Sequence, residues 1–498
     1  MDEKRMALFA VLAGTVVRII FWATTPVTGD ACFHYNVARF MSENLSIPSF
    51  EYVTGGNPFW YPPLFHIITA VLYRLTGILT LTPLVFGIGG LVAFKKFCDR
   101  FYPEHSLKSV LLLSFLPFHV YYSGIGYLES LIFLTTVLSY HYYYAYLKDG
   151  GNKQLGYAAI TSALTALTHY HGMIIPLSIT AHLALRDRKK AAVFLAAALL
   201  IASPWYVRNY MVYGNPVWPK LYGGKYPGYR DVQGISVESA VASIFSPGRW
   251  VSVFFDFWIG APNSGEDFWN NVEVGAGRYP FFMWIMVFWL TAIIALSILS
   301  FRGFMRVSER RDQEMIAIVF ALSLIPFTLN GLARMFIAVI PFLVIAVSKG
   351  VGGISNRGMM LATPAVILLL VGGSYGYAQT YKNLVEGYEP FFEKIREEMP
   401  EGSRIVMPFM IHECIYYTGM HCLKIGGAGS LPEFDTKDMR QIFKDYDVEY
   451  VCCNRMHWSA LPEQYKSVCR RLNKEKSYVS YSEGDSWGKC WNTMSKKR

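Results

Sequence analysis

The stretch MALFAVLAGTVVRIIFWATTPVTGDACFHY, residues 6–35, decides the fold. Residues 6–24 form an apolar run of the length that crosses a bilayer as a helix, about 20 residues. No small-residue cleavage site ends this run, so we expect it to be retained as a membrane anchor. Directly after it comes Asp30, a carboxylate placed where the chain leaves the lipid. The stretch therefore predicts a membrane protein with an acid at the bilayer surface.

The composition extends this pattern to the whole chain. Of the 498 residues, 53% are hydrophobic and only 16% are charged, whereas soluble proteins carry roughly 25% charged residues. We predict a polytopic α-helical membrane protein. The net charge of +10 comes from Lys and Arg clustered at helix ends. Because membrane topology explains those clusters, no nucleic-acid partner is expected.

About 11 apolar runs are predicted to cross the membrane. They lie near 6–24, 78–97, 108–124, 129–147, 155–171, 172–186, 190–206, 281–300, 314–331, 335–348 and 359–377. With a cytoplasmic N-terminus, every basic connection between runs falls on the cytoplasmic side, as the positive-inside rule expects. This requires that Tyr61 to Leu75 does not cross. That segment is short, opens with Pro62-Pro63 and carries His66 and Arg74, which favours a helix lying in the interface.

The same assignment divides the chain into two parts. Residues 1–377 form the transmembrane part, with a first outer loop at 25–77 and a long outer loop at 207–280. Residues 378–498 form an extracytoplasmic tail, where strands are predicted at Arg404–Met407 and Glu449–Cys452. Helix-like stretches at 389–399, 435–446 and 461–474 alternate with them. The tail is therefore expected to be a small α/β domain.

Six of the eight cysteines lie in this tail: Cys414, Cys422, Cys452, Cys453, Cys469 and Cys490. An outward-facing domain permits disulfides, but the sequence does not choose among the pairings. Buried free thiols and a zinc site are the alternatives, although the spacings match no standard zinc finger.

Asp30 has two candidate roles. The stretch after it, Ala31 to Asn44, places Phe33, Val37, Phe40 and Met41 on one helical face, which predicts an interfacial amphipathic helix. At the N-terminus of that helix a carboxylate can cap free backbone N–H groups. It can equally act as a general base at the membrane surface.

Glu129 is the second candidate acid, at the outer mouth of the run 129–147. Ionisable groups at a membrane boundary are expensive and indicate function, although an acid at a helix N-terminus is also stabilised by the helix dipole. Arg334 interrupts two apolar runs and offers a fork of donors suited to phosphate, with snorkelling to the surface as the alternative. Arg208 has a similar position. Tyr61, His66 and His171 are candidates for a substrate pocket on the same side.

Two acids and an arginine at one membrane face suggest a reaction on a lipid phosphate. At this point the sequence resembles the GT-C superfamily of membrane glycosyltransferases, and most closely the branch of protein O-mannosyltransferases and the aminoarabinose transferase of lipid A. The features that resemble the family follow in its order: Asp30 after the first span, Trp60-Tyr61-Pro62-Pro63-Leu64, Glu129-Ser130, Pro204 to Pro216, and Arg334-Met335-Phe336 with Pro341 behind it.

The resemblance implies a sugar donor carried on a polyprenyl or dolichyl phosphate and inversion at the anomeric carbon, with Asp30 as base and Arg334 on the phosphate. Ala31 stands where many members have a second acid, and Met335 replaces their tyrosine. The Trp-Trp-Asp-Tyr-Gly motif of oligosaccharyltransferases is absent. No cofactor or tightly bound metal is expected, and a divalent metal is not excluded.

The acceptor implied by the resemblance is a protein, a lipid or a glycan. The competing function is a transporter or flippase of a lipid-linked glycan intermediate. Transporters favour repeated halves and sites near the bilayer midplane, whereas the candidates here lie at the outer boundary and no repeat is visible. We therefore expect an integral, multi-pass membrane enzyme of the cell membrane, or of the endoplasmic reticulum in a eukaryote.

Overall fold

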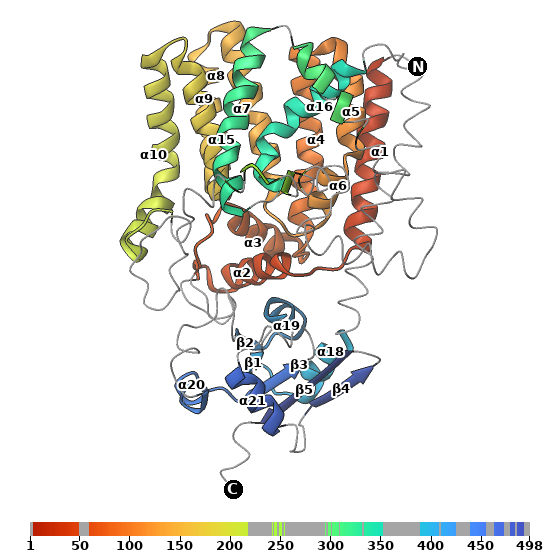
Figure 1. Cartoon of the computed structure of the whole chain (residues 1–498), viewed down its shortest axis with the longest axis vertical. Coiled ribbons are helices and arrows are strands. Elements are labelled where there is room, and N and C mark those ends of the chain that lie inside the picture. The colour runs from red at the N-terminus through yellow and green to blue at the C-terminus, as the bar shows by residue number, and fades with distance from the viewer. Residues whose placement is uncertain are drawn as a thin grey trace. The chain divides into compact units, whose positions relative to one another are not determined.

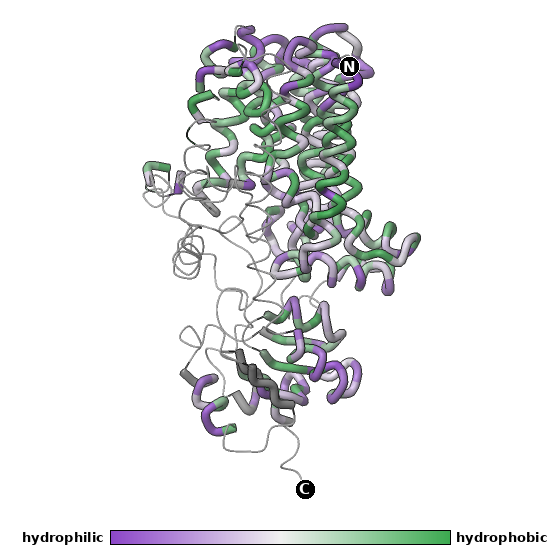
Figure 2. Tube along the Cα trace, turned by 90° about the vertical axis from the view of Figure 1, so that its right-hand side faces the viewer, coloured by the Kyte–Doolittle hydropathy of each residue, from purple (hydrophilic) through white to green (hydrophobic). Residues whose placement is uncertain are grey.

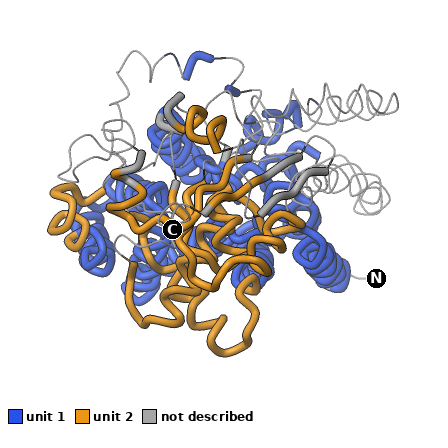
Figure 3. The backbone as a smooth tube through the Cα atoms, turned by 90° about the horizontal axis from the view of Figure 1, so that it is seen from below, with its two compact units in different colours: residues 1–25, 82–206, 235–378 blue, residues 26–81, 207–234, 379–498 orange. Residues whose placement is uncertain are grey.

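The computed structural model describes residues 3–48, 59–217, 301–307, 309–330, 333–351, 389–407, 410–424, 439–454, 463–472, 479–483 and 486–492, with isolated positions between 242 and 299. Most of the long loop 207–280, most of the expected span 281–300 and all of the expected span 359–377 lie outside the described residues. The chain forms two compact units (Figure 3). Unit 1 comprises residues 1–25, 82–206 and 235–378, and unit 2 comprises residues 26–81, 207–234 and 379–498.

Unit 1 is helical (Figure 1). Its described elements are α1 (Glu3–Thr24), α4 (Leu81–Phe101), η2 (Pro103–His105), α5 (Ser106–Phe115), α6 (Pro117–Gly124), α7 (Glu129–Asp149), α8 (Asn152–Thr168), η3 (Tyr170–Met173), α9 (Ile174–Ala184), α10 (Arg188–Tyr213), α15 (Arg310–Asn330), η4 (Ala333–Val339) and α16 (Ile340–Gly350). Among the described helices, three are long and apolar enough to cross a membrane: α1 over Arg5–Thr24, α4 and α10. The end of α10, residues 207–213, belongs to unit 2.

Two expected spans are interrupted. The run 108–124, expected as one helix, breaks between α5 and α6 at Leu116, whose backbone is extended. The cause is Pro117, which disfavours the helical conformation in the residue before it and cannot donate to Leu113. The run 335–348 also begins as the tight helix η4 and becomes α-helical only at Ile340.

Arg18 donates hydrogen bonds to backbone carbonyls at the break between α5 and α6. Its side chain is fully buried. Nη2 donates to the carbonyl of Leu113 at 3.1 Å, and Nη1 donates to that of Ser114 at 2.8 Å. Leu113 is the residue whose helical partner would be the missing N–H of Pro117. Gly14 makes the approach possible, because a Cβ there would meet Ser114 Cβ at 2.8 Å.

The basic connections of unit 1 gather at one end of its helices. Arg100 Nη2 lies 2.5 Å from Asp149 Oδ2, which joins the last residues of α4 and α7. Arg186 Nη2 lies 2.7 Å from Glu314 Oε2, which joins the end of α9 to the first turn of α15. Figure 2 shows hydrophilic residues at the end of unit 1 where the N-terminus lies, and hydrophobic residues along the middle of its helices.

Unit 2 contains the helices α2 (Asp30–Asn44) and α3 (Leu64–Thr76). With 13 residues, α3 rises only about 20 Å, short of the roughly 30 Å of a hydrocarbon core. This length agrees with the expectation that the segment does not cross. Helix α2 packs on α3 and on a helix of the tail, α19 (Ile411–Thr418).

The described part of the tail in unit 2 forms a five-stranded sheet between helices, in the order β2-β1-β3-β5-β4. Its strands are β1 (Arg404–Met407), β2 (His421–Lys424), β3 (Tyr450–Asn454), β4 (Val479–Glu483) and β5 (Ser486–Asn492). Strand β1 pairs in parallel with β2 and β3, and β5 pairs antiparallel with β3 and β4. Strand β1 has the expected bounds, and β3 begins one residue after its expected start. The helices α18 (Glu389–Glu398), α20 (Met439–Asp445) and α21 (Glu463–Leu472) lie within the three helix-like stretches of the sequence.

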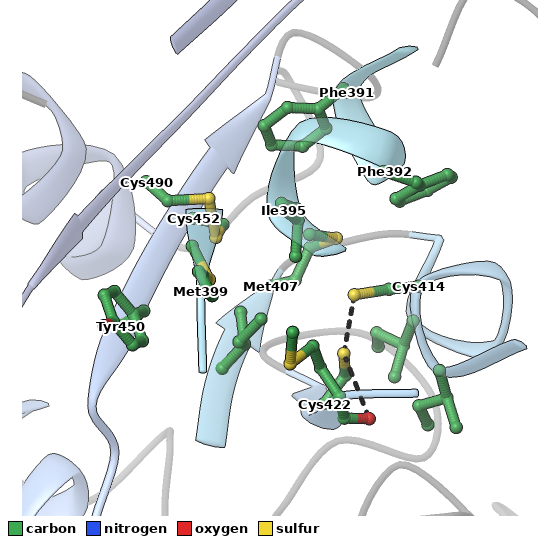
Figure 4. Packing of buried hydrophobic residues seen from close by; sticks show 14 residues of the cluster. Phe391, Phe392, Ile395, Met399, Met407, Cys414, Cys422, Tyr450, Cys452 and Cys490 are labelled. Carbon is green, nitrogen blue, oxygen red and sulfur yellow. Dashed lines mark hydrogen bonds between the residues drawn. A yellow bond between two sulfur atoms is a disulfide. The ribbon is translucent and has the colours of Figure 1, made fainter. Parts of the chain in front are cut away.

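Strand alternation sorts the core and the cysteines onto two faces of the sheet. Ile405 and Cys452 point to the face covered by α18 and α19, where Phe391, Phe392 and Cys414 pack (Figure 4). Val406 and Cys453 point to the opposite face, with α20 and α21. Because successive side chains of a strand alternate between faces, the adjacent cysteines bond to different partners. Cys452 is bonded to Cys490, and Cys453 is bonded to Cys469.

Candidate functional site

Asp30 is the first residue of α2. The N-cap position before it is Gly29, whose φ of 54° and ψ of −128° lie in a region that glycine tolerates. The capping position considered for Asp30 therefore belongs to a residue without a side chain. Asp30 is half-buried at the positive end of the helix dipole.

A residue far along the chain reaches the same turn. Glu413 Oε1 accepts a hydrogen bond from the backbone N–H of Gly29 at 2.7 Å. Glu413 is buried, with 9% of its surface exposed. Burial raises the pKa of its carboxyl, and the charge of Asp30 raises it further, while the hydrogen bond from Gly29 opposes both effects. The sequence pattern did not single out Glu413, and the only signal was an acid in the first turn of a helix.

Two of the predicted pocket residues, Tyr61 and His66, lie together in unit 2 around His34. Nδ1 of His34 and Nε2 of His66 are 2.9 Å apart, and the Tyr61 ring lies edge-on to His34 with centroids 5.0 Å apart. Burial lowers the pKa of His66, and the neighbouring His34 lowers it further. The 2.9 Å separation places a hydrogen bond between the two imidazoles, with a nitrogen of one ring as donor and a nitrogen of the other as acceptor.

Arg208, predicted as a phosphate contact, lies at the end of α10 in unit 2. Its Nη1 donates to the carbonyl of Phe59 at 3.4 Å, and its guanidinium lies over the Tyr213 ring at 5.1 Å. The hydroxyl of Tyr213 donates to the same carbonyl at 2.9 Å. Arg208 and Tyr213 thus hold the chain directly before Trp60-Tyr61-Pro62-Pro63.

The other acid and the other arginine meet in unit 1. Glu129 is the first residue of α7, and Arg334 lies in the first turn of η4. Glu129 Oε1 and Arg334 Nη1 are 3.7 Å apart, with 2% and 20% of the side chains exposed. Arg334 also lies over the ring of Tyr127, 5.8 Å from its centroid. The structure therefore pairs the two residues that the sequence treated as separate candidates.

His171, the third predicted pocket residue, lies in η3 of unit 1. Its backbone N–H donates to Nδ1 of His169 at 3.2 Å, and the two imidazole centroids are 4.1 Å apart. The side chain is buried. Its neighbour in the structure is thus His169, two residues earlier in the chain.

An apolar cavity of about 610 Å³ lies in unit 1, and side chains of η4 and of the helices around it line the cavity. Phe336, two residues after Arg334, is part of its wall. The other lining residues are Trp250, Val253, Ser297, Phe301, Phe304, Ile316, Ala317, Phe320, Val339, Phe342, Leu343 and Ala346. The short helix η4 therefore carries a cation and one wall of an apolar cavity.

No group of three His, Cys, Asp or Glu side chains that could hold a metal ion occurs in the part of the chain that the structure describes. The carboxylates of Asp30 and Glu413 lie in unit 2, and that of Glu129 is engaged by Arg334. The expectation that no metal is tightly bound stays a prediction.

The sequence matches no protein-family model and no curated protein. Solved structures do match. ArnT from Cupriavidus metallidurans bound to undecaprenyl phosphate has a TM-score of 0.64 at 13% identity, with 97% of each chain covered. Its apo state has a TM-score of 0.60 at 13% identity and the same coverage.

The archaeal oligosaccharyltransferase AglB from Archaeoglobus fulgidus, in complex with an inhibitory peptide and a dolichol-phosphate, has a TM-score of 0.57 at 13% identity. The match covers 98% of this chain and 74% of AglB. At this identity the likenesses establish the fold. The chain thus shares the fold of ArnT and AglB, and three of its described helices are long and apolar enough to cross a membrane.

Proposed function

We propose that this chain is a membrane glycosyltransferase that moves a sugar from a polyprenyl- or dolichyl-phosphate donor to an acceptor hydroxyl on the extracytoplasmic side. The observation that carries the proposal is on η4. The Arg334 guanidinium is paired there with Glu129, and Phe336, two residues later, is part of the wall of the apolar cavity. A lipid phosphate needs both features, a fixed cation for the headgroup and apolar volume for the prenyl chain. ArnT and AglB, which share the fold, were solved with such lipid phosphates.

In the proposed reaction, Asp30 accepts the proton of the acceptor hydroxyl while the hydroxyl oxygen attacks the anomeric carbon. The bond from that carbon to the phosphate oxygen breaks, and its electron pair leaves with the lipid phosphate. Arg334 stabilises the charge on the departing phosphate, and Glu129 holds the guanidinium. A single displacement of this kind inverts the anomeric configuration.

The remaining predicted residues are proposed to support binding. Arg208 is a second phosphate contact in this proposal, and Tyr61, His66 and His171 line the substrate pocket. The acceptor is a hydroxyl of a protein, a lipid or a glycan. The half-buried position of Asp30 at the start of α2 suits a base that must reach a large acceptor at the membrane surface.

Asp30→Asn tests the base. Membranes containing the full chain are given a panel of radiolabelled polyprenyl- and dolichyl-phosphate sugars, and transfer of label to acceptors is measured. The variant is expected to lose at least about a hundredfold in kcat, the usual effect of removing a general base. The amide keeps the size of the carboxylate, so donor binding should be preserved.

Asp447→Asn is the matched control, because its carboxylate is 73% exposed and pairs only at the surface with Arg404. It is expected to transfer sugar like the wild type. Undiminished transfer by Asp30→Asn would remove Asp30 from the base role. Movement of a lipid-linked glycan across the membrane without any transfer product would instead support the flippase.

A further inference from the structure

Helix α19 has two faces with different partners inside unit 2. Ile411, Cys414 and Ile415 lie at helical spacing and pack into the sheet core (Figure 4). The opposite face carries His412, Glu413 and Tyr416, while Tyr417 lies at the boundary, with its ring stacked on Phe392 of the core. Helix α19 packs against α2. A helix fixed on the sheet thus presents polar side chains to the helix that begins with Asp30.

The contacts of this polar face concentrate at the start of α2. Glu413 Oε1 accepts from the N–H of Gly29 at 2.7 Å, and the Tyr417 hydroxyl donates to the carbonyl of Val27 at 2.9 Å. Farther along α2, Nδ2 of Asn36 donates to the carbonyl of His412 at 2.9 Å. The backbone on the N-terminal side of Asp30 is therefore held from the tail at two points.

Glu413 holds a backbone amide with a buried carboxylate, which is an energetically unfavourable group to bury. It is 9% exposed, and burying a carboxylate is destabilising unless its hydrogen bonds compensate. The neighbouring carboxylate of Asp30 adds repulsion between like charges. The hydrogen bond from the Gly29 N–H is the contact that ties this buried carboxylate to the residue directly before Asp30.

We propose that Glu413 is a positioning residue for Asp30, acting through the Gly29 N–H that its carboxylate holds. The inference rests on the proposed function, in which Asp30 is the base. Gly29 has a positive φ that glycine can leave easily once its N–H is released. Since Asp30 is the next residue, a rotation at Gly29 moves the carboxylate directly, and a displacement of about 1 Å can cost a hundredfold in rate.

Three substitutions separate the effect of the length of the Glu413 side chain from the effect of its charge. Glu413→Gln keeps an oxygen at the same distance and removes the charge. Glu413→Asp keeps the charge and withdraws the oxygen by one methylene. Glu413→Ala removes both. We expect kcat to fall roughly tenfold to a hundredfold in the Ala and Asp variants, with the donor KM unchanged, and Gln to restore most of kcat.

Two further readouts complete the design. Glu397→Ala on α18 is the matched control, since Glu397 is exposed in the same unit, and it should behave like the wild type. Hydrogen exchange is followed by mass spectrometry in a peptide covering residues 26–33. The Gly29 amide should exchange faster in Glu413→Ala and Glu413→Asp than in the wild type or Glu413→Gln.

The outcomes separate this inference from the proposed function. Loss of activity in Asp30→Asn together with full kcat in Glu413→Ala would overturn the positioning role and leave the function intact. A slow Glu413→Gln variant beside a Glu413→Asp variant with the kcat of the wild type would also overturn it, because charge and not reach would then matter. Full activity of Asp30→Asn would remove the base assignment, and the positioning role with it, even if the exchange data located the Glu413–Gly29 hydrogen bond.

Discussion

At the scale of single residues, the contact between Glu129 and Arg334 changes how the role of each is interpreted. Alone, each has an ordinary explanation at a membrane boundary, as a helix N-terminal acid and as a snorkelling arginine. Their separation of 3.7 Å makes them a largely buried ion pair. Arg334 is thereby held near the start of η4, which a snorkelling side chain would not be.

Arg334→Ala is expected to raise the apparent KM for the lipid-phosphate donor by roughly tenfold to a hundredfold. That is the effect of losing a charge-assisted hydrogen bond worth about 1.5–3 kcal/mol. Arg334→Lys should lie between, because the ammonium keeps the charge but lacks the planar fork. The measurement is the donor dependence of the initial transfer rate.

Arg310→Ala is the control for this series, since the Arg310 side chain is 89% exposed at the far end of α15. Its donor KM should match that of the wild type. If Arg334→Ala left the donor KM unchanged, the phosphate contact would be excluded and the pair with Glu129 would be purely structural.

Charged residues at the ends of apolar runs could be predicted from the sequence, which is why Asp30, Glu129 and Arg334 were all found. Glu413 could not, because its partner Gly29 is 384 positions away. Nothing in the local pattern of α19 distinguishes this acid from one in a solvated first turn. Only the folded tail identifies what it touches.

At the scale of elements, run length predicted the long helices and missed their interruptions. Helices α1, α4, α7 and α10 match apolar runs of the sequence. The break at Pro117 was not predicted, because hydropathy is continuous across it. Short strands such as β2 and β5 were missed for a related reason: strand pairing with distant partners, and not local pattern, defines them.

The fold is expected to depend on the Arg18 side chain at the α5–α6 break. Arg18→Leu leaves the carbonyls of Leu113 and Ser114 without their side-chain donor in an apolar setting, which should destabilise the fold by on the order of 3 kcal/mol. Thermal unfolding of the detergent-solubilised chain measures the change. Arg5→Leu is the control, because Arg5 is exposed at the start of the same helix. Equal melting temperatures for the two variants would show that the break needs no side-chain donor.

At the scale of the whole molecule, the charged residues of unit 1 form two groups at opposite ends of its helices. Helix α7 runs from Glu129 to Asp149, and α15 runs from Arg310 to Asn330. Asp149 and Glu314 bind the basic residues Arg100 and Arg186 at one end of this unit. Glu129 and its partner Arg334 lie at the other end. This separation is what the positive-inside rule needs if Glu129 and Arg334 act outside the cytoplasm.

The orientation is tested with epitope tags in intact and permeabilised cells. A tag inserted among residues 302–309 should bind antibody only after permeabilisation, because the basic connections are expected in the cytoplasm. A tag at the C-terminus should bind in intact cells, since the disulfides Cys452–Cys490 and Cys453–Cys469 require an oxidising compartment. For an endoplasmic reticulum protein, selective permeabilisation of the plasma membrane should expose only the 302–309 tag. A shielded C-terminal tag with an exposed 302–309 tag would invert the topology and place Glu129 and Arg334 on the cytoplasmic face, where the proposed transfer could not use an extracytoplasmic acceptor.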